Sequence, residues 1–183
     1  VIHGNSVSSV PGGAAIWIDQ KGSATTVTVT GNSITGSSGS SLFYITNSSN
    51  PITPTISNNN ALNNDTTYWI YNDKVTGTDT IDIENNWWGT TTESEIQTKI
   101  YDWNDDASLG FLDYDPYLTA PTTLAPVSPP KNVVKQSTTG GIALSWAANP
   151  EADVSGYKIY YGTYNGYSFA SSVDAGNVTS YVL

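Results

Sequence analysis

The sequence predicts an all-β protein whose longer, N-terminal part is a coil of repeated short strands. Charged residues make up only 12% of the chain, against roughly 25% in an average soluble domain, and Asn, Ser, Thr and Gly take their place. Short segments alternate between polar and β-branched residues, as in Thr-Val-Thr-Val-Thr at 26–30, which is typical of strands. The strongest observation is an internal repeat with a step of 27 residues, a period that indicates stacked repeats.

Two bands of the sequence recur with this step. The first starts with an apolar residue and has Asn in fourth place: IHGNSV at 2–7, VTGNSI at 29–34, ISNNNA at 56–61 and IENNWW at 83–88. The second is apolar and aromatic: AAIWI at 14–18, SLFYI at 41–45 and YWIYN at 68–72. One repeat cannot bury its own apolar face, so like strands must stack in parallel, about 4.8 Å apart. We therefore expect a right-handed parallel β-helix of about four 27-residue rungs, each rung being one turn of the coil.

The repeat places several residue types in columns along this coil. The columns expected to point inward are Val27 and Ile81; Ile2, Val29, Ile56 and Ile83; Val7, Ile34 and Trp88; and Ile16, Phe43 and Ile70. The Asn residues of the first band, Asn5, Asn32, Asn59 and Asn86, form a column at the turns. We interpret it as a ladder of side-chain amides, each bonding the next rung; an Asn-lined binding cleft is the functional alternative.

The pattern changes after Trp88, where we expect a structure that closes the last rung. A short helix is predicted within 90–103, because Ile96, Ile100 and Trp103 have helical spacing, with Thr92 and Glu95 as a capping box. Trp88 falls in an inward column, so its neighbour Trp87 must face the other way. The pair, together with the three apolar residues of the helix, is predicted to plug the open end of the coil.

The segment that follows the repeats carries a specific motif. It runs N-x-WWG, a short helix ending in D-x-x-D, then G-x-x-x-Y-x-P-x-L-x-x-P, carried here by Asn85, Trp87, Trp88, Gly89, Asp102, Asp105, Gly110, Tyr114, Pro116, Leu118 and Pro121. With the repeats, this resembles the terminal part of bacterial and archaeal parallel β-helix surface proteins, over residues 1–121. The resemblance implies an exported protein, and often recognition or cleavage of polysaccharides.

A second resemblance covers the C-terminal part. Residues 122–130 are rich in Pro and predict a linker, and 131–183 is similar to a fibronectin type III domain. Trp146 matches the core Trp of the second strand, Tyr157–Tyr160 the third strand, and 177–183 a strand that crosses back beneath Trp146. The family pattern has two further strands after this point, so the predicted β-sandwich is incomplete.

The missing strands would leave one edge of the predicted sandwich open. The exposed edge is the third strand, with Tyr157, Ile159, Tyr160 and Tyr161, and open edges invite the addition of another strand. Truncation is one explanation. The other is that a second chain supplies the strands and the protein polymerises.

Charge and composition narrow the classes of partner. The formal net charge is −10, and the basic residues are all Lys, which argues against binding to nucleic acid. No apolar run reaches the roughly 20 residues of a membrane span. Cys is absent, so disulfides and thiolate metal sites are excluded. The Ser-, Thr- and Asn-rich composition predicts an extracellular or cell-surface location.

The sequence assigns no catalytic residue. The nearest constellation is Asp19 and Asp73 with Lys74, in which the two carboxylates would lie two rungs apart, roughly 10 Å. Inverting glycosidases place theirs about 6.5–9.5 Å apart. Solvated turn residues explain these positions equally well.

No cofactor is predicted, although two acidic groups have ligand chemistry suited to Ca²⁺. The weak candidates are Asp102, Asn104, Asp105 and Asp106. A further set is Asp79, Asp82 and Glu84, for which a solvated acidic face is the alternative.

An aromatic column offers the best candidate for contact with a partner. Trp17, Tyr44 and Tyr71 recur at the repeat step and alternate with inward residues, so they are expected to face outward. Such a stripe can stack sugar rings, pack on a neighbouring subunit, or stabilise its own sheet through cross-strand contacts.

Together these features predict a secreted or cell-surface structural and adhesion protein. It would self-assemble into a polymer by strand addition and end-to-end stacking, with other copies of itself or surface glycans as partners. The alternatives are a glycan-binding module and the C-terminal part of a polysaccharide lyase or glycoside hydrolase.

Overall fold

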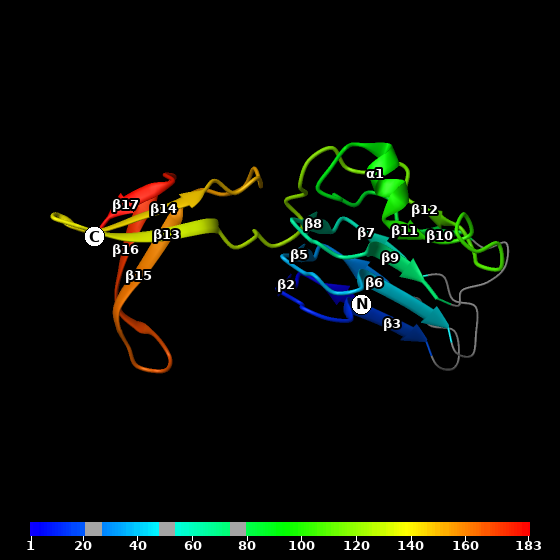
Figure 1. Ribbon diagram of the computed structural model, residues 1–183, viewed down its shortest axis with the longest axis horizontal. Coiled ribbons are helices and arrows are strands. Elements are labelled where there is room, and N and C mark those ends of the chain that lie inside the picture. Colours follow the sequence, from blue (N-terminus) through cyan, green and yellow to red (C-terminus); the bar gives the residue numbers. More distant parts are fainter. Residues whose placement is uncertain (21–26, 48–53, 74–79) are drawn as a thin grey trace. The chain divides into compact units, whose positions relative to one another are not determined.

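The computed structural model describes residues 1–20, 27–47, 54–73 and 80–183 (Figure 1). The chain forms two compact units, Val1–Ser128 and Pro129–Leu183. The first unit extends beyond the predicted boundary at Pro121. The backbone N–H of Thr122 donates to Asn60 Oδ1 at 2.8 Å, and Ala125 and Ser128 are buried, so this part of the predicted linker packs within the first unit.

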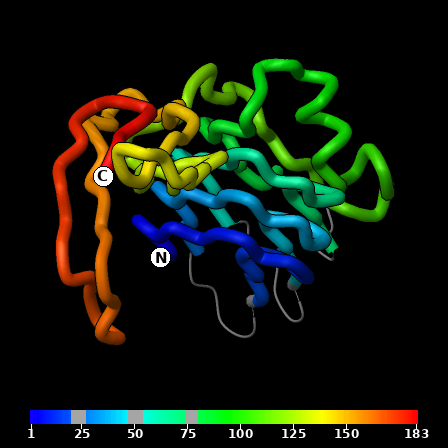
Figure 2. Tube along the Cα trace, turned by 60° about the vertical axis from the view of Figure 1, so that its left-hand side comes forward, coloured from blue at the N-terminus to red at the C-terminus, as the bar shows by residue number. Residues whose placement is uncertain are grey.

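The first unit is a parallel β-solenoid of about three turns, which confirms the all-β class and the coiled repeat. Its first sheet contains β1 (Ile2–His3), β4 (Thr28–Thr30) and β7 (Thr55–Ser57). Its second contains β2 (Ser6–Ser8), β5 (Ser33–Thr35) and β8 (Asn60–Leu62). Its third contains β3 (Ala14–Gln20), β6 (Ser41–Asn47), β9 (Tyr68–Asn72) and β11 (Ile100–Tyr101). Figure 2 shows successive turns of the chain lying one over the next.

The strand register follows the 27-residue step. Val29 pairs with Ile2 on one side and Ile56 on the other. The inward residues of the three sheets merge into one core, in which Val29, Ile56, Ile34, Phe43 and Ile70 are fully buried. The core forms because alternation sends every second residue of each strand inward and stacking covers it from above and below.

The last part of the first unit departs from the regular repeat. β10 (Ile81–Asp82) pairs in parallel with β12 (Leu112–Asp113), and Trp87 forms an isolated bridge with Asn60. The backbone N–H of Asn85 donates to Pro116 O at 2.6 Å, and that of Leu118 donates to Asn86 O at 3.0 Å. Residues 112–118 therefore cover the backbone edge that the last repeat would otherwise expose.

The predicted helix exists but is shorter than its spacing indicated. α1 spans Glu93–Thr98, and Ile96 is its buried residue. Ile100 is also buried, but in β11 rather than on the helix. Trp103 is 43% exposed and stacks on Phe111, so its assignment to the plug is wrong. The capping box is wrong as well: Thr92 is the N-cap, but its side chain makes no capping hydrogen bond.

The second unit contains five antiparallel strands in two sheets. One sheet has the order β13 (Lys131–Thr138), β14 (Gly141–Ala147), β17 (Ser180–Val182), and the other pairs β15 (Tyr157–Tyr164) with β16 (Phe169–Gly176). Trp146 on β14 is buried, and its ring lies 5.2 Å from that of Tyr157 on β15. This contact joins the two sheets.

In the part of the chain that the structure describes, no helix has the length and apolar character of a membrane span.

Candidate functional site: the outer aromatic face

The outer surface of the sheet β3-β6-β9-β11 carries a continuous group of aromatic rings, here called the aromatic face. Trp17, Tyr44 and Tyr71 come together on it in register, as the repeat predicts. The ring centroids of Trp17 and Tyr44 are 4.7 Å apart, and those of Tyr44 and Tyr71 are 5.5 Å apart. Figure 1 shows the strands of this sheet side by side. Trp17 is 63% exposed, and the two tyrosines are half-buried.

Two further rings of the aromatic face were missed in the sequence. Tyr101 on β11 pairs with Tyr71, and their rings stack at 4.5 Å with planes 8° apart. Tyr68 lies beside this stack, 5.4 Å from both Tyr71 and Tyr101. A signal for Tyr101 was present: Ile100-Tyr101 repeats the pattern of an apolar residue followed by an aromatic one at Ile70-Tyr71. It was hidden because α1 and its flanks lengthen the step between these pairs.

The orientation of the rings limits what the stack can bind. Tyr44 and Tyr71 are nearly parallel, with 8° between their planes, as are Tyr71 and Tyr101. The faces of Tyr71 are therefore covered by its two neighbours, so a sugar cannot lie flat on that ring. Trp17 ends the stack at an angle of 45° to Tyr44, and its high exposure leaves indole surface open to solvent.

Asp73 anchors the Tyr44 hydroxyl. Burial, followed by a side-chain hydrogen bond with Asp73 and the negative charge of that carboxylate, raises the pKa of Tyr44 to about 12. Thr46 Oγ1 also donates to Asp73 Oδ2, at 3.2 Å. This carboxylate therefore holds hydroxyl groups of the preceding rung.

The acidic pair considered for catalysis lies along this column. Asp19 is exposed and pairs in register with Thr46, which bonds Asp73. Thr46 thus stands between the two carboxylates along the sheet. Lys74, the third member of the predicted constellation, lies outside the described residues.

A shallow depression lies beside the ring stack. Its volume is about 240 Å³, and it is lined by Ser40, Tyr44, Thr67, Tyr68 and Tyr71. The lining combines aromatic surface with hydroxyl groups, so it offers a ligand both packing surface and hydrogen-bond partners.

The predicted Asn ladder lies elsewhere on the solenoid and bonds its rungs together. Asn59 Nδ2 donates to Asn86 Oδ1 at 2.9 Å, and Asn32 Nδ2 donates to Asn59 Oδ1 at the same distance. Asn5 Nδ2 continues the series to Asn32 Oδ1. Asn32, Asn59 and Asn86 are buried, and their amides bond one another and neighbouring backbone carbonyls rather than lining a cleft.

The Trp pair at the end of the repeats is split between two faces. Trp88 is buried in the core with Ile96 and Ile100. Trp87 is half-buried and pairs with Asn60, whose side chain bonds Thr122. One indole therefore fills the core, and the other lies on the opposite face of the chain.

The candidate calcium ligands are engaged in their own loop. Asp102 is buried; its Oδ1 accepts from Asn104 N at 2.9 Å and its Oδ2 from Leu112 N at 3.0 Å. Asp105 Oδ2 accepts from Asp102 N at 3.2 Å. Hydrogen bonds from the backbone and side chain of Ser108 lower the pKa of Asp106. Among the described residues, no group of three or more His, Cys, Asp or Glu side chains is arranged to hold a metal ion.

The second acidic set is only partly described. Asp82 Oδ1 accepts from Glu84 N at 3.0 Å, which makes it a local turn acceptor. Asp79 lies outside the described residues.

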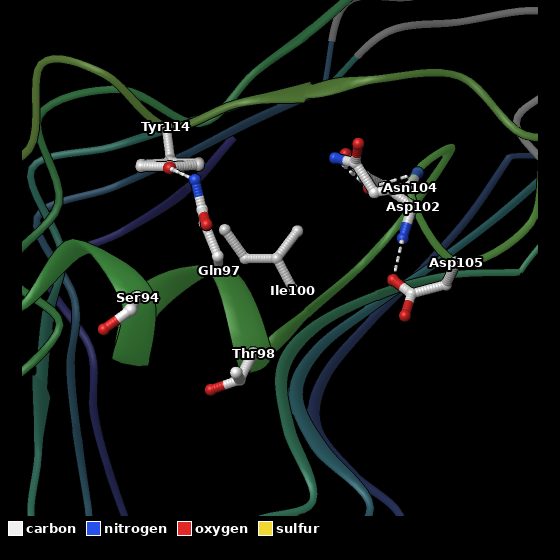
Figure 3. Close-up of a pocket in the computed structure, with 8 residues that line it drawn as sticks. All are labelled: Ser94, Gln97, Thr98, Ile100, Asp102, Asn104, Asp105 and Tyr114. Atoms are coloured by element: carbon white, nitrogen blue, oxygen red, sulfur yellow. Dashed lines mark hydrogen bonds between the residues drawn. The ribbon is translucent and has the colours of Figure 1, made fainter.

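A pocket of about 480 Å³ separates this loop from α1. Figure 3 shows Gln97 and Tyr114 on one side, Asp102, Asn104 and Asp105 on the other, and Ile100 between them. Gln97 Nε2 donates to the Tyr114 hydroxyl at 2.8 Å. This bond joins α1 to the segment after β12. The bond from Leu112 N to Asp102 Oδ2 joins the loop to β12 itself.

The predicted strand-addition edge lies in the second unit. β15 pairs with β16 along one edge, and within the described residues its other edge has no partner strand. Tyr160 and Tyr161 are exposed, whereas Tyr157 and Ile159 are half-buried.

Comparison with protein-family models, with curated proteins and with solved structures finds no match to this chain. The two family resemblances therefore rest on the motifs of the sequence.

Proposed function

We propose that this chain is a structural and adhesion protein of the cell surface or the extracellular space. The observation that carries the proposal is the aromatic face, which stands on the outside of a solenoid whose rungs are bonded to one another. The buried Asn ladder and the stacked tyrosines connect successive rungs on two sides. A support of this kind holds exposed rings such as Trp17 in fixed positions, as a contact surface requires.

We also propose a fourth rung in the first unit and a β-sandwich in the second. Ile83, Trp88 and Ile100 continue the buried columns of the third rung, which supports a fourth rung closed by the N-x-WWG cap. In the second unit, the two antiparallel sheets and the contact between Trp146 and Tyr157 support a β-sandwich of the fibronectin type III kind.

Self-assembly by strand addition is the structural part of the proposed function. The free edge of β15 offers backbone donors and acceptors to a strand of another copy. A two-stranded sheet is marginally stable by itself, so a third strand would stabilise the unit. Sedimentation velocity of the intact chain over a range of concentrations, with electron microscopy of the same samples, tests this. Concentration-dependent assemblies are expected, and a monomer at every concentration rejects self-assembly.

Glycan binding is the second candidate, favoured by the depression beside the rings and by the exposure of Trp17. It makes the surface glycan, rather than another copy, the partner of the aromatic face. A glycan array probed with the intact protein and with Trp17→Ala tests whether this face binds sugar.

A further inference from the structure

Tyr68, which lines the depression on the aromatic face, is the large member of a column of otherwise small residues. Ala14, Ser41 and Tyr68 occupy equivalent positions on successive strands. The column therefore changes from small side chains to a tyrosine between β6 and β9. Ser41 is buried, whereas Tyr68 is half-buried and is the member of this column that lines the depression beside Tyr44.

The ring of Tyr68 is oriented differently from the stack. Its plane makes angles of 56° with Tyr71 and 64° with Tyr101, while its centroid is 5.4 Å from each. Because Tyr68 is equally far from both stacked rings and inclined to both, it lies beside the stack, next to the edges of the two rings. Unlike Tyr71, it is not enclosed between two parallel rings, so a face of Tyr68 remains available to the depression that it lines.

The chemistry of the lining fits a sugar ring. A pyranose has C–H surfaces that pack on an aromatic face, and hydroxyls around its edge that need hydrogen-bond partners. Tyr68 supplies the aromatic ring, and Ser40 and Thr67 supply hydroxyl groups at the same depression. A volume of about 240 Å³ is smaller than a typical drug-sized pocket and suits one sugar unit rather than an extended chain.

The charges around the depression favour a sugar without negative charge. The chain has a net charge of −10, and the carboxylate of Asp73 is hydrogen-bonded to Tyr44, which lines the depression. Lys99 lies nearby; its Nζ donates to Thr66 O at 2.7 Å and to Thr67 O at 3.4 Å, so backbone carbonyls hold its ammonium group. The overall field repels anionic glycans such as uronic acids.

We propose that this depression is a binding subsite for a single neutral pyranose unit, with Tyr68 as the stacking ring. The inference rests on the glycan-binding candidate and makes it specific. It assigns recognition to Tyr68 and the hydroxyls of Ser40 and Thr67, and not to the faces of the stacked column Tyr44, Tyr71 and Tyr101.

The test uses the intact chain and a panel of methyl glycosides of glucose, galactose, mannose and N-acetylglucosamine, with glucuronic acid as the anionic member. Binding is measured by saturation-transfer NMR and calorimetry. Tyr68→Ser extends the small residues of the preceding rungs and is expected to weaken binding of the neutral sugar by about tenfold. Tyr68→Phe keeps the ring and should keep the affinity, and Tyr167→Ser is a control at an exposed tyrosine of the other unit that lies outside its strands.

The outcomes separate the subsite from the broader proposal. If neutral sugars bind and Tyr68→Ser binds them as well as the unaltered chain does, the subsite is overturned while glycan binding stands. If Trp17→Ala alone abolishes binding, the sugar lies at the end of the stack, which also overturns the subsite. If no neutral member of the panel binds, or glucuronic acid binds more tightly, the assignment of a neutral sugar fails. If Tyr68→Ser does not fold, Ser40→Ala and Thr67→Val decide the matter, because they remove the exposed hydroxyls that line the depression: unchanged affinity for the neutral sugar in both variants overturns the subsite.

Discussion

The indole of Trp88 stacks on that of Trp69, with ring centroids 5.8 Å apart and planes inclined by 3°. Phe43 meets Trp88 edge-on at 6.4 Å. These rings belong to the core cluster and connect the segment after Asn86, the last Asn of the ladder, to the sheet that carries the aromatic face. Trp88 therefore fills the end of the core on the inner side of the sheet whose outer side we propose as the contact surface.

Removal of Trp88 should strongly destabilise the first unit. Trp88→Ala deletes a fully buried ring, and substitutions of this kind typically cost about 3–5 kcal/mol in the free energy of unfolding. Trp103→Ala is the matched control, because Trp103 is 43% exposed and lies outside the core cluster. Urea unfolding followed by far-ultraviolet circular dichroism measures both. Equal losses for the two variants would contradict the plug at Trp88.

The Asn ladder should be strongest in its interior. Asn59 donates to Val29 O at 3.0 Å and to Asn86 Oδ1 at 2.9 Å, and its own Oδ1 accepts from Asn32 N at 3.0 Å. Asn59→Ala removes these three side-chain bonds, although Asn86 Oδ1 keeps its bond from the backbone N–H of residue 59. Each buried group that is left unpaired costs about 1–3 kcal/mol. Asn5→Ala removes an exposed member and should cost much less. Thermal unfolding of both variants checks this, and a larger loss for Asn5→Ala would refute the interpretation.

Ionisation of Tyr44 should weaken the fold at alkaline pH. Its pKa is raised from 10.0 to about 12, so the folded state favours the protonated phenol. The resulting stabilisation is fully present below pH 10 and is lost as the pH rises through about 12. Between these values, the free energy of unfolding should fall more steeply for the unaltered chain than for Tyr44→Phe.

Absorbance at the phenolate band provides the second readout for Tyr44. Subtracting the titration curve of Tyr44→Phe from that of the unaltered chain should leave one transition, which belongs to Tyr44 and lies near pH 12. A difference transition near the ordinary value of 10.0 would show that Asp73 and burial do not hold this phenol in its protonated form.

Strand addition should depend on the edge of β15. A lysine on an exposed edge strand opposes pairing with another chain, so Tyr160→Lys should reduce the concentration-dependent assembly seen by sedimentation. Tyr167→Lys makes the same chemical change at a residue that is 96% exposed and lies outside the strand. Assembly that survives Tyr160→Lys but not Tyr167→Lys would place the contact at the hairpin tip.

Much of the solenoid could be predicted because its repeat step is strict. The partners Ile2, Val29 and Ile56, and the members of the Asn ladder, follow directly from the 27-residue spacing. The prediction failed where a local pattern competed with the repeat. Ile96, Ile100 and Trp103 satisfy helical spacing, but Ile100 pairs with Ile70 in the sheet, because extending the sheet buries Ile100 and continues the stack with Tyr101.

The candidate site was less accessible to sequence reasoning. The repeat predicts that Trp17, Tyr44 and Tyr71 share a column, but it does not give the angles between their rings. Tyr68 was missed because its register partners are Ala14 and Ser41, so its column has no aromatic pattern. A ring that stands alone in its column is visible only once its neighbours are placed.

A chemical-shift map of the intact, nitrogen-15-labelled protein tests the proposed contact surface most directly. The titrant is the neutral methyl glycoside that binds best in the panel. If the aromatic face is the contact surface, the shifted amides will cluster at Ser40, Thr67 and Tyr68 and extend along β6 and β9. Shifts confined to the second unit or to the pocket between α1 and Asp102, or no shifts at saturating sugar, would contradict it.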